Sequence, residues 1–253
     1  MRIVTYNVEY CEGINKRWKY YIELQKYFRI VKKTLLKITD YLEEVNPDIL
    51  ALIEIDSGSI RVQKLSGAQL FAEKLGMKYC VEKVKYSRKS AYKLLNYLPI
   101  VRKLANAILS KKPLKKTKYH YLSKGVKRLV IQSTIEVDGK ELDLFAVHLA
   151  VRKKTRVKQL KELASIVNQS SNPKIVFGDF NIFKGLSELE YFLKKTNMLN
   201  AAEDRDVKTY PSWKPKHHLD HILISQEIKV NSYEVLNIDY SDHLPVLLDF
   251  ELE

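Results

Sequence analysis

The segment Asp48–Ile55 constrains the fold most strongly, because it is almost entirely apolar over eight residues. A strand of this composition has no polar face to turn toward water, so both of its faces must be covered by other elements. The residues before it, from about Tyr20 to Val45, place apolar side chains three and four positions apart, which predicts a long amphipathic helix that ends at Asn46-Pro47. A helix beside a fully buried strand predicts a layered α/β protein.

The rest of the chain continues this alternation of predicted strands and helices. Asp138-Gly139 is a strong hairpin signal, and it separates the predicted strands Leu129–Val137 and Leu142–His148. No Pro-, Gly- or Ser-rich linker interrupts the sequence, so we expect residues 1–253 to form a single domain. The remaining predicted strands are 2–8, 78–84, 105–110, 174–177, 219–225, 229–236 and 246–252, and the remaining predicted helices are 59–75, 153–168 and 186–196. Many strands with helices between them indicate a mixed α/β sandwich.

The positive charge of the chain is concentrated in one segment. The net charge is +14, and Lys83–Arg128 holds 15 Lys and Arg residues without one Asp or Glu, whereas the other residues carry 29 basic and 30 acidic groups. We expect long loops here, around the strand Ala105–Ser110. Five tyrosines lie among the cations: Tyr86, Tyr92, Tyr97, Tyr119 and Tyr121. Cations interleaved with aromatic rings favour a polyanionic partner, although a lysine-rich surface is also compatible with a merely solvated face.

Several classes of protein are disfavoured by the sequence. The longest apolar run is about eight residues, far from the ~20 that span a bilayer. The first residues already form a predicted strand, which leaves no room for a signal peptide. Cys11 and Cys80 are the only cysteines and are too few and too distant for a disulfide framework or a metal knuckle. We therefore expect a cytoplasmic protein, and nothing in the sequence demands an obligate protein partner.

Polar side chains stand at the ends of the predicted strands. After the strand 174–177, Gly178 allows a tight exit, and Asp179 and Asn181 then project to the same side of an extended segment. A carboxylate beside a carboxamide is a candidate proton-abstracting and orienting pair, although Gly-Asp-x-Asn is also ordinary turn chemistry. The other polar residues at strand ends are Asn7, Glu54, His148, Asp220, Asp242 and His243. A set rich in carboxylate and amide oxygens suits Mg²⁺ better than zinc.

Together these segments resemble the endonuclease/exonuclease/phosphatase superfamily, which has the fold of deoxyribonuclease I. Each segment is unspecific alone, but they occur in the family's order and span nearly the whole chain. The resemblance implies a four-layer α/β sandwich, with two central, mostly antiparallel sheets flanked by helices and a metal-dependent phosphoesterase site at one sheet edge. The matching segments are Thr5-Tyr6-Asn7, Ile53-Glu54, Asn106–Ser110, His148-Leu149, Gly178–Asn181, Leu219–Ile222 and Ser241–His243.

The same resemblance implies a metal site. Glu54 would be the principal ligand of Mg²⁺, with Mn²⁺ as the alternative ion, and Asn7 would lie beside it. Asp242 would be near the metal, directly or through water. Asn106 would support the phosphate or the groups behind it. Taken singly, Asn7 also fits the cap of a turn.

The resemblance further implies the groups that act on the phosphoester. Asp179 would orient or deprotonate the attacking water, and Asn181 would hold that water or the phosphate. His243 would contact the phosphoryl oxygens with its tautomer set by Asp220, and His148 would be a second cationic or hydrogen-bonding clamp. Taken singly, Asp220 also fits the start of a strand, and His148 fits a satisfied core histidine.

Two other groups of basic residues stay outside the predicted site. Arg152 and Arg156 begin a predicted helix, where a structural ion pair is as good an explanation as phosphate binding. His217, His218 and His221 crowd together in the sequence, and we interpret them as a basic rim rather than a further metal site.

The substrate is the least determined part of the prediction. The segment His148-Leu149 resembles the deoxyribonuclease, sphingomyelinase, inositol-phosphatase and tyrosyl-DNA phosphodiesterase branches more than the abasic-site endonucleases. The basic segment surrounds Asn106 and would place cations beside the scissile phosphate, so we expect a Mg²⁺-dependent nuclease or DNA/RNA-end phosphodiesterase. One alternative is a phosphoesterase that acts on phosphoinositide-like or other anionic lipids, or on small phosphoesters. In the lipid case, the basic segment of the enzyme would bind the membrane surface. The other is a nucleic-acid-binding module that has lost catalysis.

Overall fold

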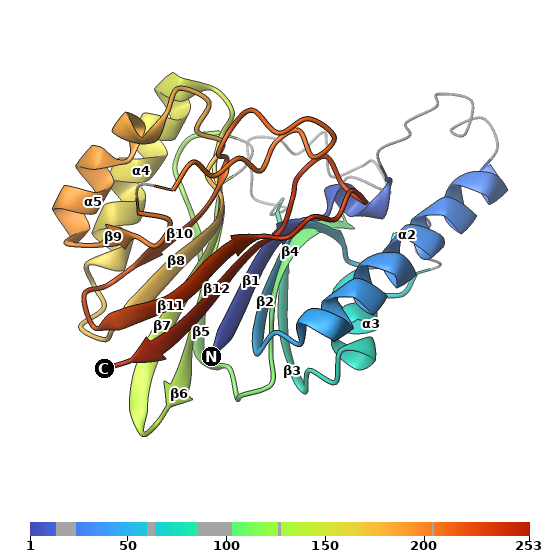
Figure 1. The fold of residues 1–253 in the computed structure, drawn as a ribbon, viewed down its shortest axis with the longest axis horizontal. Helices are drawn as coiled ribbons and strands as arrows, with labels where there is room; N and C mark the ends of the chain where they lie inside the picture. Colours follow the sequence, from blue (N-terminus) through green and yellow to red (C-terminus); the bar gives the residue numbers. More distant parts are fainter. Residues whose placement is uncertain (14–23, 60–63, 86–102, 126–127, 204) are drawn as a thin grey trace.

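Two mixed, six-stranded sheets pack face to face and helices cover the outer face of each sheet (Figure 1). The computed structural model describes residues 1–13, 24–59, 64–85, 103–125, 128–203 and 205–253. The predicted four-layer α/β sandwich with mostly antiparallel sheets is confirmed. None of the helices in the described ranges is long and apolar enough to cross a membrane.

The first sheet has the strand order β11-β12-β1-β2-β4-β3. Among its strands β1 and β2 are parallel, and the other neighbours are antiparallel. Helices α2 (Leu24–Val45) and α3 (Gly67–Lys74) cover its outer face (Figure 1). The strands are β1 (Arg2–Asn7), β2 (Ile49–Asp56), β3 (Tyr79–Val84), β4 (Leu104–Ser110), β11 (Ile228–Val235) and β12 (Val246–Leu252), and the 3₁₀ helix η1 (Glu9–Cys11) follows β1.

The second sheet has the order β5-β6-β7-β8-β10-β9, with β7 and β8 parallel. Helices α4 (Lys153–Val167) and α5 (Glu190–Thr196) lie on its outer face (Figure 1). The strands are β5 (Lys115–Tyr121), β6 (Leu129–Val137), β7 (Lys140–His148), β8 (Lys174–Asp179), β9 (Leu199–Asn200) and β10 (Asp220–Ile224), and the 3₁₀ helix η5 (Leu186–Glu188) precedes α5.

Strand β2 is buried on both faces, as its apolar sequence predicts. Ile49 and Ala51 pack into the layer between the two sheets, whereas Leu50 and Leu52 pack under the helices of the first sheet. The predicted amphipathic helix is confirmed in α2, and residues 20–23 of that prediction lie outside the described ranges. Within 31–45, the apolar side chains that α2 buries are Val31, Leu35, Ile38 and Leu42. Their spacing of three and four positions matches the helical period.

Helix α3 is shorter than the predicted helix 59–75. It begins at Gly67 because Ser66 is extended (φ −70°, ψ 124°) and its Oγ accepts a hydrogen bond from the backbone N–H of Gln69 at 3.2 Å. A serine in this position satisfies one of the free N–H groups of the first turn. Residues 60–63 lie outside the described ranges.

The basic segment contains a strand that we did not predict, in addition to the predicted strand Ala105–Ser110. Strand β5 pairs with β6 at the edge of the second sheet. Its lysines Lys115, Lys116 and Lys118 are exposed, and charged side chains on an edge strand are tolerated because they discourage pairing with other chains. The lysines hide the alternation of apolar residues by which a strand is usually found. Tyr86, Tyr92 and Tyr97 lie outside the described ranges.

The two parallel strand pairs bring the predicted site residues to one end of the sandwich. His148 ends β7 in register with Asp179, which ends β8. Asn7 ends β1 in register with Ile53 of β2, one residue before Glu54. Parallel strands end at the same edge of a sheet, so these four polar side chains converge without any long loop to carry them.

Candidate active site

Asp179 lies at the centre of the candidate site and is completely buried. Its Oδ2 accepts a hydrogen bond from Asn7 Nδ2 at 3.0 Å, and it lies 3.2 Å from His148 Nε2 and 4.0 Å from His243 Nε2. Its Oδ1 accepts the backbone N–H of Asn181 at 2.9 Å. Both oxygens are therefore fixed in direction, with one imidazole approaching from each sheet. A carboxylate oriented in this way is suited to accept a proton from a water molecule.

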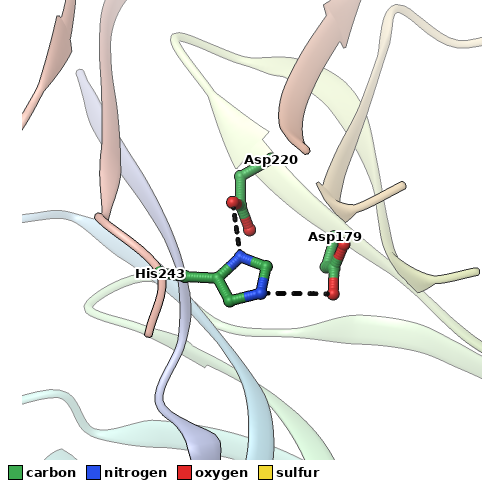
Figure 2. Close-up of side chains that lie close together, drawn as sticks. All are labelled: Asp179, Asp220 and His243. Atoms are coloured by element: carbon green, nitrogen blue, oxygen red, sulfur yellow. Dashed lines mark hydrogen bonds and ion pairs between the residues drawn. The ribbon is translucent and has the colours of Figure 1, made fainter. Parts of the chain in front are cut away.

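Figure 2 shows His243 between two carboxylates. Its Nδ1 donates to Asp220 Oδ2 at 2.7 Å, and its Nε2 faces Asp179. Thr209 Oγ1 donates to the same Asp220 oxygen at 2.7 Å. Burial by itself would lower the pKa of His243, but the carboxylates of Asp220 and Asp179 raise that pKa to about 10. His243 is thus a cation at neutral pH, held in one orientation, which suits the binding of a phosphoryl oxygen.

Lys85, which we did not predict as a site residue, lies between His148 and Glu54. Lys85 Nζ lies 3.1 Å from Tyr10 Oη, 3.3 Å from Glu54 Oε1 and 3.4 Å from His148 Nδ1. An ammonium group has only hydrogens to offer, so its contact with His148 uses the lone pair of Nδ1. The proton of a neutral His148 then stands on Nε2, which faces Asp179. A carboxylate also lies near each ring nitrogen of His148, since Glu54 Oε1 is 3.7 Å from Nδ1 and Asp179 Oδ2 is 3.2 Å from Nε2.

Glu54 occupies a β-bulge. The register between β2 and β4 shifts between Leu52 and Ile55, and Glu54 has a positive φ of 60°. Its backbone N–H donates to Asn106 Oδ1 at 3.2 Å, so the buried Asn106 holds the bulge in place. Bulges turn side chains out of the regular alternation of a strand and are common beside functional sites. The Nδ2 of Asn106 has no hydrogen-bond partner among the described residues, which leaves a buried donor for a substrate or a water.

The turn that carries His243 is fastened to β1. Ser241 Oγ donates to the backbone carbonyl of Asn7 at 2.6 Å and lies 3.4 Å from Asp242 Oδ1. The backbone carbonyl of Asp242 accepts the N–H of Ser212 at 2.9 Å. These bonds place Asp242 beside the end of β1, on the same side of the site as Asn7.

The sequence profile of the Endonuclease/Exonuclease/phosphatase family matches residues 4–243, from the strand that ends at Asn7 to His243. The chain belongs to the endonuclease/exonuclease/phosphatase family. Enzymes of this family are hydrolytic phosphoesterases and generally depend on a divalent metal ion. The segments that carry the resemblance in the sequence therefore belong to one catalytic fold, and the structure gathers them at one end of it.

Comparisons with individual proteins place this family member among diverse relatives. Uncharacterized protein YbhP of Escherichia coli (strain K12) is 29% identical over 163 residues, which are 58% of this chain and 62% of YbhP. The chain thus spans about 62% of the length of this curated relative. An endonuclease/exonuclease/phosphatase family protein from Leptotrichia buccalis C-1013-b has a TM-score of 0.70 at 19% identity, and each chain is covered to 100%. A mannosyl-6-phosphatase from Bacteroides thetaiotaomicron VPI-5482 also has a TM-score of 0.70, at 16% identity and 100% coverage of each chain. At 19% and 16% identity, the similarity to these two structures shows that this chain has the same fold.

The donor atoms at this family site fit a hard divalent cation. Asp179, Asp220 and His243 offer ligand atoms that all lie within 4.8 Å of one another. Asp220 and His243 are already bonded to each other at 2.7 Å, and the Glu54 side chain is 14% exposed. Carboxylate and amide oxygens are the ligands that Mg²⁺ and Mn²⁺ prefer. The predicted metal ligands are also engaged inside the protein, since Glu54 Oε1 lies 3.3 Å from the Lys85 ammonium and Asn7 Oδ1 accepts the N–H of Glu9 at 3.2 Å, and their assignment to the metal stays a prediction.

Asn181 fastens the loop that follows His148. Its Nδ2 donates to the backbone carbonyl of Leu149 at 3.0 Å, and its backbone has a positive φ of 55°. Asparagine tolerates this left-handed conformation better than most residues. Asn181 thus donates two hydrogen bonds inside the protein: its side-chain amide donates to Leu149, and its backbone N–H donates to Asp179.

The omission of Arg156 from the site is supported by its surroundings. Its guanidinium is buried and forms a forked ion pair with Glu188, at 2.7 Å from Nη2 to Oε2 and 3.2 Å from Nε to the same oxygen. Its Nη1 also donates to the backbone carbonyl of Ala150 at 2.9 Å. The ion pair holds η5 against the loop after His148, so the role of Arg156 is structural.

Arg156→Met is expected to lower the free energy of unfolding by about 3 kcal/mol, because it leaves the buried Glu188 carboxylate without its cation. The double variant Arg156→Met/Glu188→Leu removes both charges and should recover part of that loss. Urea unfolding of the wild type, both single variants and the double variant measures the coupling. A loss in the double variant that equals the sum of the two single losses would show that the ion pair contributes nothing.

The interpretation of the three histidines as a basic rim is wrong for two of them. Burial lowers the pKa of His218 to about 4 and lowers that of His221 well below its ordinary value. The two rings lie 3.9 Å apart between centroids, and His221 also packs edge-on against Phe180. Both are therefore neutral at pH 7, with His221 in the core and His218 half-buried beside it. The sequence contained no sign of this, because their burial depends on how β10 packs.

Proposed function

We propose that this chain is a Mg²⁺-dependent phosphodiesterase that acts on nucleic acid, as a nuclease or as a hydrolase that processes DNA or RNA ends. The observation that carries the proposal is the buried Asp179 carboxylate, held by Asn7 and Asn181 and flanked by His148 and His243. This arrangement supplies a base and two groups for the phosphoryl oxygens in a site that excludes bulk water.

Asp179 acts as the base that orients and deprotonates the attacking water. Its two oxygens are held by donors on both sides, so the carboxylate is fixed in one orientation. A base that is already oriented toward the water lowers the entropic part of the barrier that the same reaction has in solution. The family's hydrolytic chemistry needs such a base because a phosphodiester is negatively charged and repels hydroxide.

Charge on the phosphoryl oxygens is neutralised by residues around Asp179. His243, kept cationic by Asp220, offers Nε2, and His148 offers its Nε2–H. These dipoles and charges are in place before the substrate arrives, which is the main source of transition-state stabilisation in such sites. Glu54 and Asn7 would hold a divalent ion, which would supply further positive charge to the phosphoryl oxygens.

The preference for nucleic acid rests on the cations beside the site. Lys83 pairs in register with Asn106, and its ammonium lies 4.7 Å from the centre of the Tyr119 ring. Arg128 lies 5.8 Å from the centre of the Tyr121 ring. Cations paired with aromatic rings suit a polyanion that also carries bases. A lipid headgroup or a sugar phosphate would use the charge but has no base for the rings.

The test is hydrolysis of labelled single- and double-stranded DNA and RNA with Mg²⁺, Mn²⁺ or EDTA. We expect metal-dependent cleavage of at least one nucleic acid, which EDTA abolishes and Glu54→Gln strongly reduces. Bis-p-nitrophenyl phosphate and phosphoinositide vesicles serve as comparison substrates. Hydrolysis of either comparison substrate without cleavage of any nucleic acid would contradict the proposal and favour a lipid or small-molecule phosphoesterase.

A further inference from the structure

One flank of the site carries an exposed tryptophan on a firmly anchored loop. Trp213 is 60% exposed, the largest value for a big apolar side chain in the described part of the chain. It follows Ser212, whose N–H donates to the Asp242 carbonyl at 2.9 Å and whose hydroxyl donates to the Ser241 carbonyl at 2.6 Å. The loop is therefore bonded to the same turn that carries His243. An indole exposed to water on a fixed support is typical of a binding surface.

The loop that carries Trp213 also carries two exposed lysines and begins at a tyrosine whose ring lies against His243. Lys214 and Lys216 are exposed on either side of Pro215. The N–H of Lys216 donates to the Tyr210 carbonyl at 2.8 Å, which closes the loop. The Tyr210 ring lies 5.0 Å from the His243 ring, so the loop rests directly on a residue of the site.

The opposite flank carries the two cation–aromatic pairs, with Lys83, Tyr119 and Tyr121 on the edge strands β3 and β5 and with Arg128 just before β6. Tyr119 is 37% exposed and lies under the ammonium of Lys83, and Tyr121 lies beside Arg128. Tyr121 Oη donates to the carbonyl of Val84 at 3.2 Å, which joins the edge strand β5 of one sheet to the edge strand β3 of the other. Tyr119 and Tyr121 are two residues apart on one strand and so share a face.

The order of the strands places the site between these two flanks. In the first sheet β1, β2 and β4 lie between β12 and β3, and in the second sheet β8, β7 and β6 lie between β10 and β5. Asn7, Glu54, Asn106, Asp179 and His148 all belong to the strands in between. Four strand spacings of about 4.8 Å separate the flanks by about 20 Å. A stacked nucleic-acid strand covers that distance with about six nucleotides at ~3.4 Å each.

We propose that a single strand of nucleic acid crosses the site from one flank to the other, with bases stacked on Tyr119 at one side and on Trp213 at the other. The inference rests on the proposed function and makes it narrower: the substrate is single-stranded, and the bond that is cut is internal. Stacking on these side chains requires the free face of an unpaired base, which a duplex does not offer. A membrane surface would explain Trp213 and its lysines, but not a second aromatic flank on the far side of a buried centre.

The first experiment compares kcat/KM for single strands of 2, 4, 6, 8 and 12 nucleotides, for a 12-base-pair duplex and for bis-p-nitrophenyl phosphate. We expect kcat/KM to rise with length up to about six nucleotides and to be higher for the single strand than for the duplex. In Trp213→Ala and in Tyr119→Ala, the ratio of kcat/KM for the 12-mer to that for bis-p-nitrophenyl phosphate should fall about tenfold. Tyr191→Ala is the control, because Tyr191 is 50% exposed on the outer helix α5.

A second measurement reads stacking directly and does not depend on cleavage. The sequence has two tryptophans, so Trp18→Phe leaves Trp213 as the single indole. With the further change Asp179→Asn to prevent turnover, a single-stranded 12-mer should quench the fluorescence of Trp213, and the matched duplex should quench it much less. High salt should weaken the effect, because phosphate contacts release counterions.

The outcomes separate this inference from the proposed function. Cleavage of oligonucleotides that is independent of length, of strandedness and of Trp213 would overturn the inference and leave the proposed function standing. Hydrolysis of bis-p-nitrophenyl phosphate without cleavage or binding of any oligonucleotide would overturn both. Loss of binding to phosphatidylserine vesicles in Trp213→Ala, with unchanged oligonucleotide cleavage, would assign the tryptophan flank to a membrane surface and overturn the inference.

Discussion

Asp179→Asn is expected to lower kcat for phosphodiester hydrolysis about a thousandfold or more, which is the usual cost of removing the base from such a site. The amide has nearly the same size but cannot take a proton from water. Rapid-quench or steady-state assays with Mg²⁺, on the best nucleic-acid substrate and on bis-p-nitrophenyl phosphate, measure the loss. A variant that keeps more than a tenth of the wild-type kcat would contradict the role of Asp179 as the base.

Asp179→Asn is also expected to lower stability, so the loss of activity must be separated from a loss of folded protein. Both Asp179 oxygens accept hydrogen bonds, from Asn7 Nδ2 and from the N–H of Asn181. An amide NH₂ in place of either oxygen faces a donor, and a buried clash of this kind costs about 1–3 kcal/mol. Activity is therefore compared at a temperature well below the midpoint of thermal unfolding of each protein. Asp143→Asn is the matched control, because Asp143 is also buried and hydrogen-bonded, to Thr134 Oγ1 at 2.6 Å, but lies in the middle of β7.

Gly178→Ala is expected to destabilise the protein by on the order of 5 kcal/mol or more, comparable with the whole stability of many domains. A Cβ on Gly178 would lie 2.0 Å from the carbonyl oxygen of Val147 and would clash with backbone rather than with a flexible side chain. The φ of +139° is also a conformation that an alanine rarely adopts. Relief of the clash requires β7 and β8 to separate where Val147 and Gly178 are paired.

Urea unfolding monitored by circular dichroism measures the effect. Gly139→Ala is the control, because Gly139 also has a positive φ, +80°, but nothing lies within 4 Å of its added Cβ. That change should cost only the local strain of about 1 kcal/mol. Equal losses at the two positions would show that conformational strain, and not the close approach of the strands, makes Gly178 necessary. Soluble Gly178→Ala protein should also lose activity, since His148 and Asp179 are the next pair in the register.

The layered fold and the position of the site could be predicted because they depend on patterns that are local in the sequence. The apolar run of β2 predicts that both faces of this strand are buried. The helical spacing of apolar residues in α2 predicts which face of the helix is buried, with Val31, Leu35, Ile38 and Leu42 on it. The polar residues that close β1, β7 and β8 mark one edge, since parallel strands end together.

Other features could not be predicted because they depend on contacts between distant segments. Lys85 looked like one cation among many in the basic segment, but the pairing of β3 with β4 brings it to Glu54 and His148. The lysines of β5 concealed a strand that only its neighbour β6 stabilises. His218 and His221 are neutral because the packing around them removes water, and charge in a protein follows burial as much as residue type.

The sequence by itself thus determined the family, the class of fold and the residues available for hydrolysis, because hydrophobic periodicity and the polar ends of strands are written in short segments. The tertiary structure alone decided how those residues act together. It turned Glu54 inward through a bulge held by Asn106 and made His243 cationic between Asp220 and Asp179. It also set the Trp213 loop and the tyrosines of β5 on opposite sides of one site, because the order of strands in a sheet is a property of the whole chain.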